Sequence, residues 1–183
     1  MPRIPYPDIS TLPEVTQKTL ASVPLNIVRI CAHASQPLFE AQGYLGRAVA
    51  VPEVLEPRLR ETVILRVGHL SNSVYELHHH IPLGRAAGLS EAQLAGIAGR
   101  NYSVLDPLLA AAARFTDEVV TLISPSDETL ANLRAVASDQ IVVNIVLTIG
   151  CYMSIARLAA VTGIEPDAKA LSHLPSSLED RVT

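Results

Sequence analysis

The sequence is poor in aromatic residues and has no excess of positive charge. Its 183 residues include no tryptophan, five tyrosines and two phenylalanines, and its formal net charge is −4. A general nucleic-acid binder needs a cationic surface that displaces counterions, or aromatic side chains on which bases stack. Both features are missing, so we expect no nucleic-acid partner.

Cysteine is equally scarce, since Cys31 and Cys151 are the only two and stand 120 positions apart. They form no CxxC redox pair, no zinc-binding pattern and no disulfide framework. Such sparse use of cysteine is typical of a reducing compartment. The N-terminal stretch MPRIPYPDISTLPEV also lacks the apolar run of a signal peptide. We therefore expect a cytoplasmic protein.

Long apolar runs are limited to one uncharged stretch, from Gln140 to Ala156. Its seventeen residues lie at the lower limit for crossing a bilayer, and Gln140 and Asn144 interrupt its apolar character. We expect a helix buried in the core or at a subunit interface, and no membrane partner.

The chain does contain apolar residues at helical spacing. Hydrophobic residues make up 49% of the sequence, which is enough to build a core, and no sustained strand-like alternation occurs. We predict an all-α protein of seven or eight helices, with one domain over residues 24–163. Because prolines cluster at the start, residues 1–23 are predicted to form an extended arm, and residues 164–183 a tail.

Capping residues, prolines and glycines mark the expected helix ends. Ser90 opens a capping box for a short helix. Pro82 lies inside a helix that should end at Gly88, and we expect it to bend that helix or break it near Ile81. Other predicted starts are Pro24, Phe39, Pro57, Asn72 or Ser73, Asp106, Ser126, and Ser138 or Asp139.

Glu61 is an acidic residue in the middle of the apolar helical stretch PRLRETVILRV. Burying a carboxylate in such a stretch is unfavourable unless the group finds a partner. Glu61 is either a surface carboxylate paired with a neighbouring arginine or a buried functional group, and the spacing alone leaves both interpretations open.

A second cluster follows in SVYELHHH, residues 73–80. Ser73, Glu76 and His80 fall at helical positions i, i+3 and i+7, so they share a face. Consecutive histidines diverge by about 100° on a helix, so the three histidines do not form a three-ligand metal site. Glu76 and His80 can form a proton-transfer pair, supply two metal ligands, or form an exposed ion pair.

These motifs resemble the carboxymuconolactone decarboxylase and alkyl hydroperoxidase D family. The most specific stretches are EPRLRETVILRVGHL and SVYELHHHIPLGRAAGLSEAQL. The resemblance implies an AhpD-like helical bundle that assembles into a homo-oligomer, either a trimer or a hexamer.

In the peroxidase branch of this family, a helical glutamate is followed twelve residues later by CxxCxxxH. Glu61 and His80 match the glutamate and the histidine, but Ser73 and Glu76 stand where the two cysteines would be. That chemistry needs a thiolate and a resolving thiol, which these two residues do not supply. An alkyl hydroperoxidase D-like peroxidase is kept as an alternative.

In the decarboxylase branch the pattern resembles YExxxH, which Tyr75, Glu76 and His80 match. The resemblance implies a cofactor-free lyase acting on a small carboxylated lactone or keto-acid-like substrate. We predict that His80 is the acid/base, Glu76 its orienting partner and Glu61 a supporting carboxylate. The predicted substrate-binding residues are Arg60 and Arg66, as carboxylate anchors, with Tyr75, His79, His33 and Ser73.

Two other hypotheses stay open. One is a non-catalytic helical oligomer that binds a small ligand, and the other is a divalent metal held by Glu61, Glu76 and His80. The lyase is the leading hypothesis, with a small-molecule carboxylate as substrate, no cofactor and no bound metal.

Overall fold

The computed structural model describes residues 2–171, and its regular structure there is entirely helical. The predicted all-α class is therefore confirmed. The helices, with two short 3-10 turns labelled η, are η1 (Ile9–Thr11), α1 (Glu14–Ser22), α2 (Asn26–Cys31), α3 (Gln36–Ala50), α4 (Pro57–Leu70), α5 (Val74–Ala86), α6 (Glu91–Gly99), η2 (Tyr102–Val104), α7 (Pro107–Leu122), α8 (Asp127–Arg134) and α9 (Asp139–Thr162).

Most predicted helix starts carry the expected side-chain cap. The Ser73 hydroxyl accepts from the Glu76 amide at the start of α5, and Ser90 forms the capping box of α6. Asp106 and Ser138 accept backbone amides in the same way at the starts of α7 and α9. These caps satisfy amides that have no partner within the helix.

The extended conformation predicted for residues 1–23 is wrong over Glu14–Ser22, which forms α1. Pro13 precedes that helix, and Thr16 and Leu20 bury one of its faces. The segment is thus stabilised by packing that the proline cluster does not reveal, and α1 brings the number of described α-helices to nine rather than seven or eight. Part of the predicted C-terminal tail, residues 172–183, lies outside the described residues.

Helix α5 continues through Pro82 to Ala86, so of the two effects expected from this proline the break near Ile81 does not occur. Proline removes one backbone donor from a helix. Buried residues on both sides of it, His80 and Leu83, anchor α5 to its surroundings, so tertiary packing outweighs this local effect.

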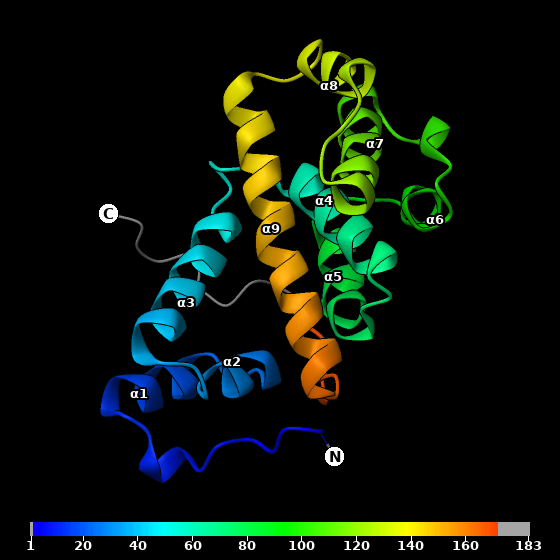
Figure 1. The fold of residues 1–183 in the computed structure, drawn as a ribbon. Coiled ribbons are helices and arrows are strands. Elements are labelled where there is room, and N and C mark those ends of the chain that lie inside the picture. Colours follow the sequence, from blue (N-terminus) through cyan, green and yellow to red (C-terminus); the bar gives the residue numbers. More distant parts are fainter. Residues whose placement is uncertain (1, 172–183) are drawn as a thin grey trace.

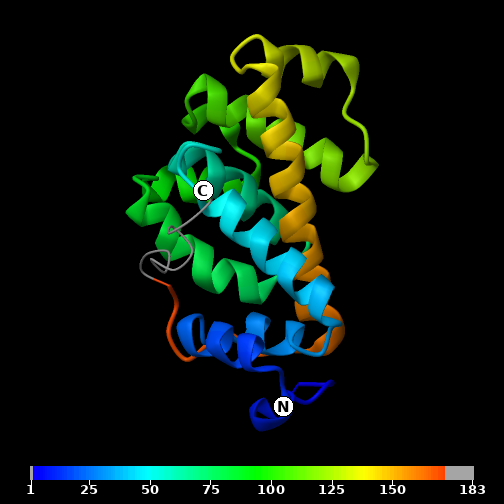
Figure 2. The same cartoon turned by 90° about the vertical axis from the view of Figure 1, so that its left-hand side faces the viewer.

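Helix α9 runs along the length of the molecule, with α3 to one side and α4 to α7 to the other in the view of Figure 1. Figure 2 shows α1 and α2 crossing one end, beside the C-terminal part of α9. Helix α4 is central: it packs against α5, α6, α7 and α9, and its residues from Leu59 to Gly68 are all buried. Side chains that project from α4 are therefore enclosed by protein.

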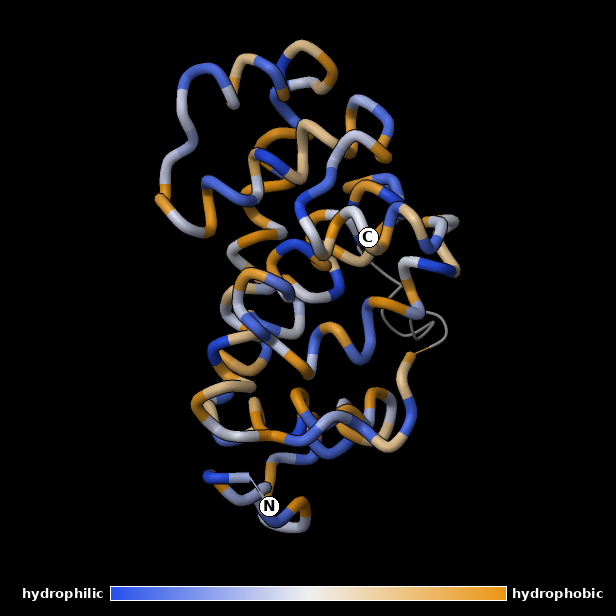
Figure 3. The backbone as a smooth tube through the Cα atoms, turned by 90° about the vertical axis from the view of Figure 1, so that its right-hand side faces the viewer, coloured by the Kyte–Doolittle hydropathy of each residue, from blue (hydrophilic) through white to orange (hydrophobic). Residues whose placement is uncertain are grey.

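Helix α9 is the only described helix that is long and apolar enough to cross a membrane on length and composition, with a mean hydropathy of 1.8 over its best window. Its inner face, which includes Ile145, Ile149 and Tyr152, is buried in the bundle, whereas Val143 and Leu147 are exposed. Hydrophobic and hydrophilic stretches alternate along the helices in Figure 3, as expected where one face of each helix is buried.

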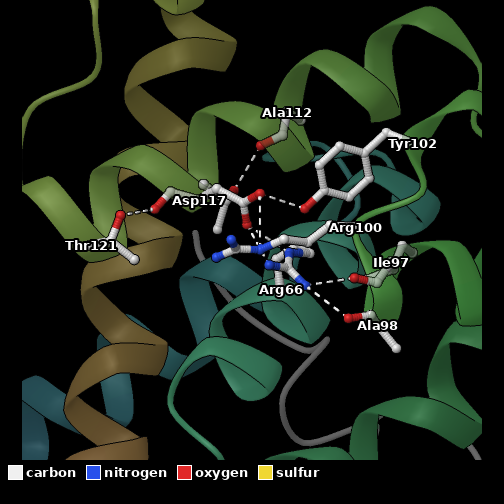
Figure 4. Close-up of polar contacts among 9 residues, drawn as sticks. Arg66, Ile97, Ala98, Arg100, Tyr102, Ala112, Asp117 and Thr121 are labelled. Atoms are coloured by element: carbon white, nitrogen blue, oxygen red, sulfur yellow. Dashed lines mark hydrogen bonds and ion pairs between the residues drawn. The ribbon is translucent and has the colours of Figure 1, made fainter.

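A buried ion pair ties the α4 side of the bundle together (Figure 4). The Arg66 guanidinium donates to Asp117 Oδ1 from Nε at 2.9 Å, and from Nη1 to the Ile97 carbonyl at 2.6 Å. The Tyr102 hydroxyl donates to Asp117 Oδ2 at 2.6 Å. Arg66 thereby links α4 to α6, η2 and α7.

We expect Asp117→Ala to destabilise the fold strongly, because it leaves the buried Arg66 guanidinium without its carboxylate. Removing one partner of a buried ion pair lowers the free energy of unfolding by roughly 3–5 kcal/mol. Urea unfolding followed by circular dichroism measures the effect. Glu53→Ala, at an exposed loop position, is the control and should change stability by less than about 0.5 kcal/mol; equal effects of the two substitutions would contradict the prediction.

Candidate functional site

A cavity of about 510 Å³ lies between the N-terminal helices α1, α2 and α3 and one face of α5 and α9. A cavity of this size can enclose a ligand of drug-like dimensions. Its wall is mostly apolar, and includes Val15, Val23, Leu25, Ile27, Val28 and Phe39. Polar side chains also line it, and four of them, Tyr75, Glu76, His79 and His80, belong to the motif of residues 73–80.

His80 and Glu61 form a buried pair at the edge of this cavity. His80 Nδ1 lies 2.8 Å from Glu61 Oε2, joining α5 to α4. The Glu61 side chain is 0% exposed and that of His80 is 9% exposed. The edge of the Tyr152 ring packs against the imidazole, with the ring centroids 5.0 Å apart. Glu61 is therefore buried rather than at the surface, and it pairs with the neighbouring Arg60 as well as with His80.

The electrostatics of Glu61 favour its ionised form. Burial alone would raise the pKa of this carboxyl, but the His80 and Arg60 charges and their hydrogen bonds outweigh that effect and hold the pKa below its usual value. An ionised carboxylate only accepts hydrogen bonds, so His80 Nδ1 carries the proton that it donates. His80 Nε2 has no hydrogen-bond partner among the described residues, and His80 lines the cavity.

Glu76 is a second buried carboxyl group in the cavity wall, and its environment is the opposite of that of Glu61. It is 2% exposed, and neither of its carboxyl oxygens has a hydrogen-bond partner among the described residues. Burial raises its pKa to about 8. Glu76 is therefore largely protonated at neutral pH and can donate a hydrogen bond to a group in the cavity.

The predicted pairing of His80 with Glu76 is wrong, because Glu61 orients the imidazole. The i, i+4 spacing places Glu76 near His80 along α5, but the adjacent helix α4 supplies the closer partner. Three of the predicted groups do meet as expected: Glu76 and His80 share the cavity wall, and Glu61 supports His80 from behind.

Arg60 and Arg66 do not line the cavity. Arg60 donates to Glu61 at 3.0 Å and to the Ala50 carbonyl at 2.6 Å, and Arg66 is held by Asp117 on the other side of α4. Both guanidinium groups are occupied by groups of the protein, because a buried arginine must be neutralised within the fold. Their predicted role as carboxylate anchors does not fit these positions.

Ser73 and His33 also lie outside the cavity wall. Ser73 caps α5. His33 is exposed, and its Nε2 lies 2.7 Å from the Pro5 carbonyl oxygen, where it fixes the N-terminal segment. Their predicted contacts with substrate are therefore not supported by the geometry.

Tyr75 and His79 line the cavity but are tied to the chain after α9. The Tyr75 hydroxyl donates to Asp167 Oδ2 at 2.6 Å, and His79 Nε2 lies 3.0 Å from the same oxygen. Asp167 Oδ1 accepts the Asn26 amide at the start of α2, at 2.9 Å. Asp167 thus joins α2, α5 and the segment after α9 beside the cavity.

The protonation of His79 follows from its two partners. The Leu171 amide donates to His79 Nδ1 at 3.2 Å, so Nδ1 is an acceptor and Nε2 carries the proton donated to Asp167. Burial lowers the pKa of His79, although Asp167 opposes this. His79 is therefore neutral, and both of its ring nitrogens are engaged by groups of the protein.

Arg47 and Asp167 are the site residues that the sequence did not reveal. Arg47, on α3, is the only lysine or arginine in the cavity wall formed by the described residues. The sequence offers little signal for either residue: Arg47 lies in an ordinary amphipathic helix, and Asp167 is separated by about 90 positions from the side chains that it contacts.

Metal binding and thiol chemistry find little support in the described part of the chain. It contains no group of three or more histidine, cysteine, aspartate or glutamate residues arranged to hold a metal ion. Glu61, Glu76 and His80 thus fail to form the metal site kept as a hypothesis. Burial raises the pKa of both Cys31 and Cys151 to about 11, so both are protonated at neutral pH.

We expect Asp167→Ala to loosen the connection between α2, α5 and the segment after α9. The substitution removes three hydrogen bonds to a carboxylate and should lower the free energy of unfolding by roughly 3 kcal/mol. It should also accelerate hydrogen exchange at the Asn26 amide. Lys169→Ala, an exposed position in the same segment, is the control, and exchange at Asn26 that is the same in both variants would count against the assignment.

We expect Glu76 to make stability depend on pH. The unfolded carboxyl group loses its proton near pH 4.5 and the folded one near pH 8. Between these values only the folded state keeps the proton, so the free energy of unfolding falls as the pH rises from about 5 to 8.

Glu76→Gln should reduce this fall, because the amide does not titrate. Urea unfolding at pH 5 and at pH 8 measures the change in the free energy of unfolding between the two pH values. Glu40→Gln, an exposed glutamate in the same cavity wall, should keep the wild-type pH dependence. A Glu76→Gln profile parallel to that of the wild type would show that the buried carboxyl does not titrate as described.

Comparison with known proteins gives a family and a fold. Residues 38–118 match the sequence model of the carboxymuconolactone decarboxylase family. No curated protein matches the chain. A structure described as an alkylhydroperoxidase AhpD core, an uncharacterized peroxidase-related protein from Ralstonia eutropha JMP134, is similar with a TM-score of 0.79 and 18% identity, covering 91% of this chain and 93% of that one.

Two further structures are similar. One is a protein of unknown function from Agrobacterium tumefaciens, named as a candidate antioxidant-defence protein AhpD; it has a TM-score of 0.68 and 25% identity, and the match covers 75% of this chain and 96% of that one. The other is an uncharacterized peroxidase-related protein from Silicibacter sp. TM1040, with a TM-score of 0.75, 17% identity and 90% coverage of both chains.

The family match covers α4 and α5, which carry Glu61, Glu76 and His80, and the structural matches extend over most of the bundle. Residues 38–118 are thus similar to the carboxymuconolactone decarboxylase family, and the chain has the AhpD-like fold.

Proposed function

We propose that this protein is a cofactor-free carboxy-lyase that removes CO₂ from an organic acid and protonates the product with His80. The observation that carries the proposal is the buried Glu61–His80 pair, whose free imidazole nitrogen belongs to a residue in the wall of an apolar cavity. A histidine held by a carboxylate is a common arrangement for proton transfer.

The reaction needs a substrate in which the departing carboxylate is bonded to the carbon next to a carbonyl group, as in a β-oxo acid. The bond between that carboxylate and the carbon breaks, CO₂ leaves, and the electron pair moves into the carbonyl to form an enolate. Protonated His80 then delivers the Nε2 proton to the carbon, and solvent restores the proton. Glu61 stabilises the imidazolium before this transfer and keeps the ring in position.

Glu76 supports the same reaction from the neighbouring turn of α5. As a protonated carboxyl group it donates a hydrogen bond to the carbonyl oxygen of the substrate, where negative charge develops. Two carboxyl groups whose pKa values are moved in opposite directions can divide acid and base roles in this way. Burial raises the pKa of Glu76 to about 8, while His80 and Arg60 outweigh burial to lower that of Glu61.

The second candidate function is a thiol peroxidase. It is favoured by the names of two similar structures, which are called peroxidase-related. Two observations oppose it. Ser73 and Glu76 stand where the peroxidase branch has its two cysteines. Burial raises the pKa of Cys31 and Cys151, so neither is a thiolate at neutral pH. A Cys31→Ser, Cys151→Ala double variant discriminates between the two functions, because it should keep lyase activity and abolish any peroxide reduction.

We also propose that the protein acts in the cytoplasm as a homo-oligomer, a trimer or a hexamer. The exposed apolar residues Val143, Val146 and Leu147 on α9 support association with other copies. Light scattering at micromolar concentration tests the oligomeric state.

We expect His80→Gln to lower turnover by about 10²–10⁴-fold, because it removes the group that donates the proton. The measurement is CO₂ release from a panel of carboxylated lactones and β-oxo acids. His78→Gln is the matched control, since His78 lies on the same helix but not in the cavity wall. Activity of His80→Gln equal to that of the control would exclude His80 as the proton donor.

A further inference from the structure

We infer that the cavity takes an elongated, largely apolar organic acid whose anionic end is held by Arg47, rather than a small compound with several carboxylates. This inference rests on the proposed function, for which it names the substrate class. It follows from the single cation in the described wall, the apolar residues and the volume of the cavity.

Arg47 is available to bind an anion. It lines the cavity, is half-buried, and makes no ion pair or hydrogen bond with another described residue. A guanidinium group binds a carboxylate through two parallel hydrogen bonds. The exposed Glu40, two helical turns earlier on α3, accepts from Gln36 at 2.7 Å, which leaves Arg47 as the anion-binding group of this wall.

Glu76 supplies the second polar contact, from the other side. Its unpartnered carboxyl group is buried on α5, and α3 and α5 lie to either side of α9 in the view of Figure 1. As a protonated group it requires an acceptor such as a carbonyl oxygen. A ligand that satisfies both residues has an anionic end at α3 and a carbonyl group at α5.

The described wall has a single cationic side chain, so the part of the ligand away from Arg47 is expected to be apolar. A carboxylate of the ligand that is not held by Arg47 has no second lysine or arginine to pair with in the described wall, so its desolvation opposes binding. Apolar contacts elsewhere must offset that free energy. The apolar wall and the volume of about 510 Å³ offer these contacts to an alkyl or aryl-alkyl body.

Helix α3 leaves room for such a body at two glycines. Gly43 and Gly46 both line the cavity, and a Cβ atom at Gly46 would have no neighbour within 4 Å. A Cβ atom at Gly43 would meet only Arg47 Nη1, at 3.4 Å. A larger residue at Gly46 therefore reduces the space beside Arg47 without disturbing the packing.

The test is calorimetric titration with straight-chain carboxylates from hexanoate to dodecanoate, which lack the carbonyl group needed for reaction. Each added methylene should tighten binding by about fourfold until the cavity is filled. Arg47→Met should weaken decanoate binding by about tenfold and leave decanol binding unchanged. Arg157→Met, an exposed arginine outside the wall, is the control and should bind decanoate like the wild type.

Gly46→Leu should shorten the chain length at which affinity stops increasing. Binding that does not depend on chain length, or equal decanoate affinity in Arg47→Met and Arg157→Met, would overturn the inference. Arg47-dependent binding without CO₂ release from any oxo acid would overturn the proposed function alone. His80-dependent CO₂ release from a small dicarboxylated lactone, without decanoate binding, would overturn this inference alone.

Discussion

The buried hydrogen bond between Glu61 and His80 is the interaction on which the site depends. A carboxylate at the centre of the buried helix α4 is unfavourable by itself, and Arg60 and His80 together make its ionised state favourable. Removing either partner of such a buried pair would leave the other without compensation, so the two groups fix each other's position. The hydrogen bond holds α5 against α4 in one register, fixes the proton on His80 Nδ1, and leaves Nε2 free for chemistry at the cavity.

The two buried glutamates show how position decides function. Glu61 and Glu76 are both almost fully buried, so desolvation raises the pKa of each. Glu61 meets cationic partners that reverse the shift, whereas the carboxyl oxygens of Glu76 meet none among the described residues. One fold thereby holds an anion behind His80 and a neutral acid in the same cavity wall, two carboxyl groups with opposite protonation at neutral pH.

The cavity is built by segments from both ends of the described chain. Helices α1, α2 and α3 form one wall, and Asp167, after α9, joins the start of α2 to Tyr75 and His79 on α5. The region matched by the family, residues 38–118, carries the reactive groups. The surrounding segments determine the size and polarity of the space in front of them, and hence which ligand fits.

The sequence by itself determined the helical class, most helix starts and the shared helix face of Glu76 and His80. These depend on local hydrogen bonds at caps such as Ser90 and on spacing along one helix, both of which operate over a few residues. Only the tertiary structure decided that Glu61 rather than Glu76 holds His80, that Arg66 serves the core, and that Arg47 faces the cavity. Those contacts join separate helices, and the distance between two helices is fixed by the packing of the whole core rather than by any local pattern.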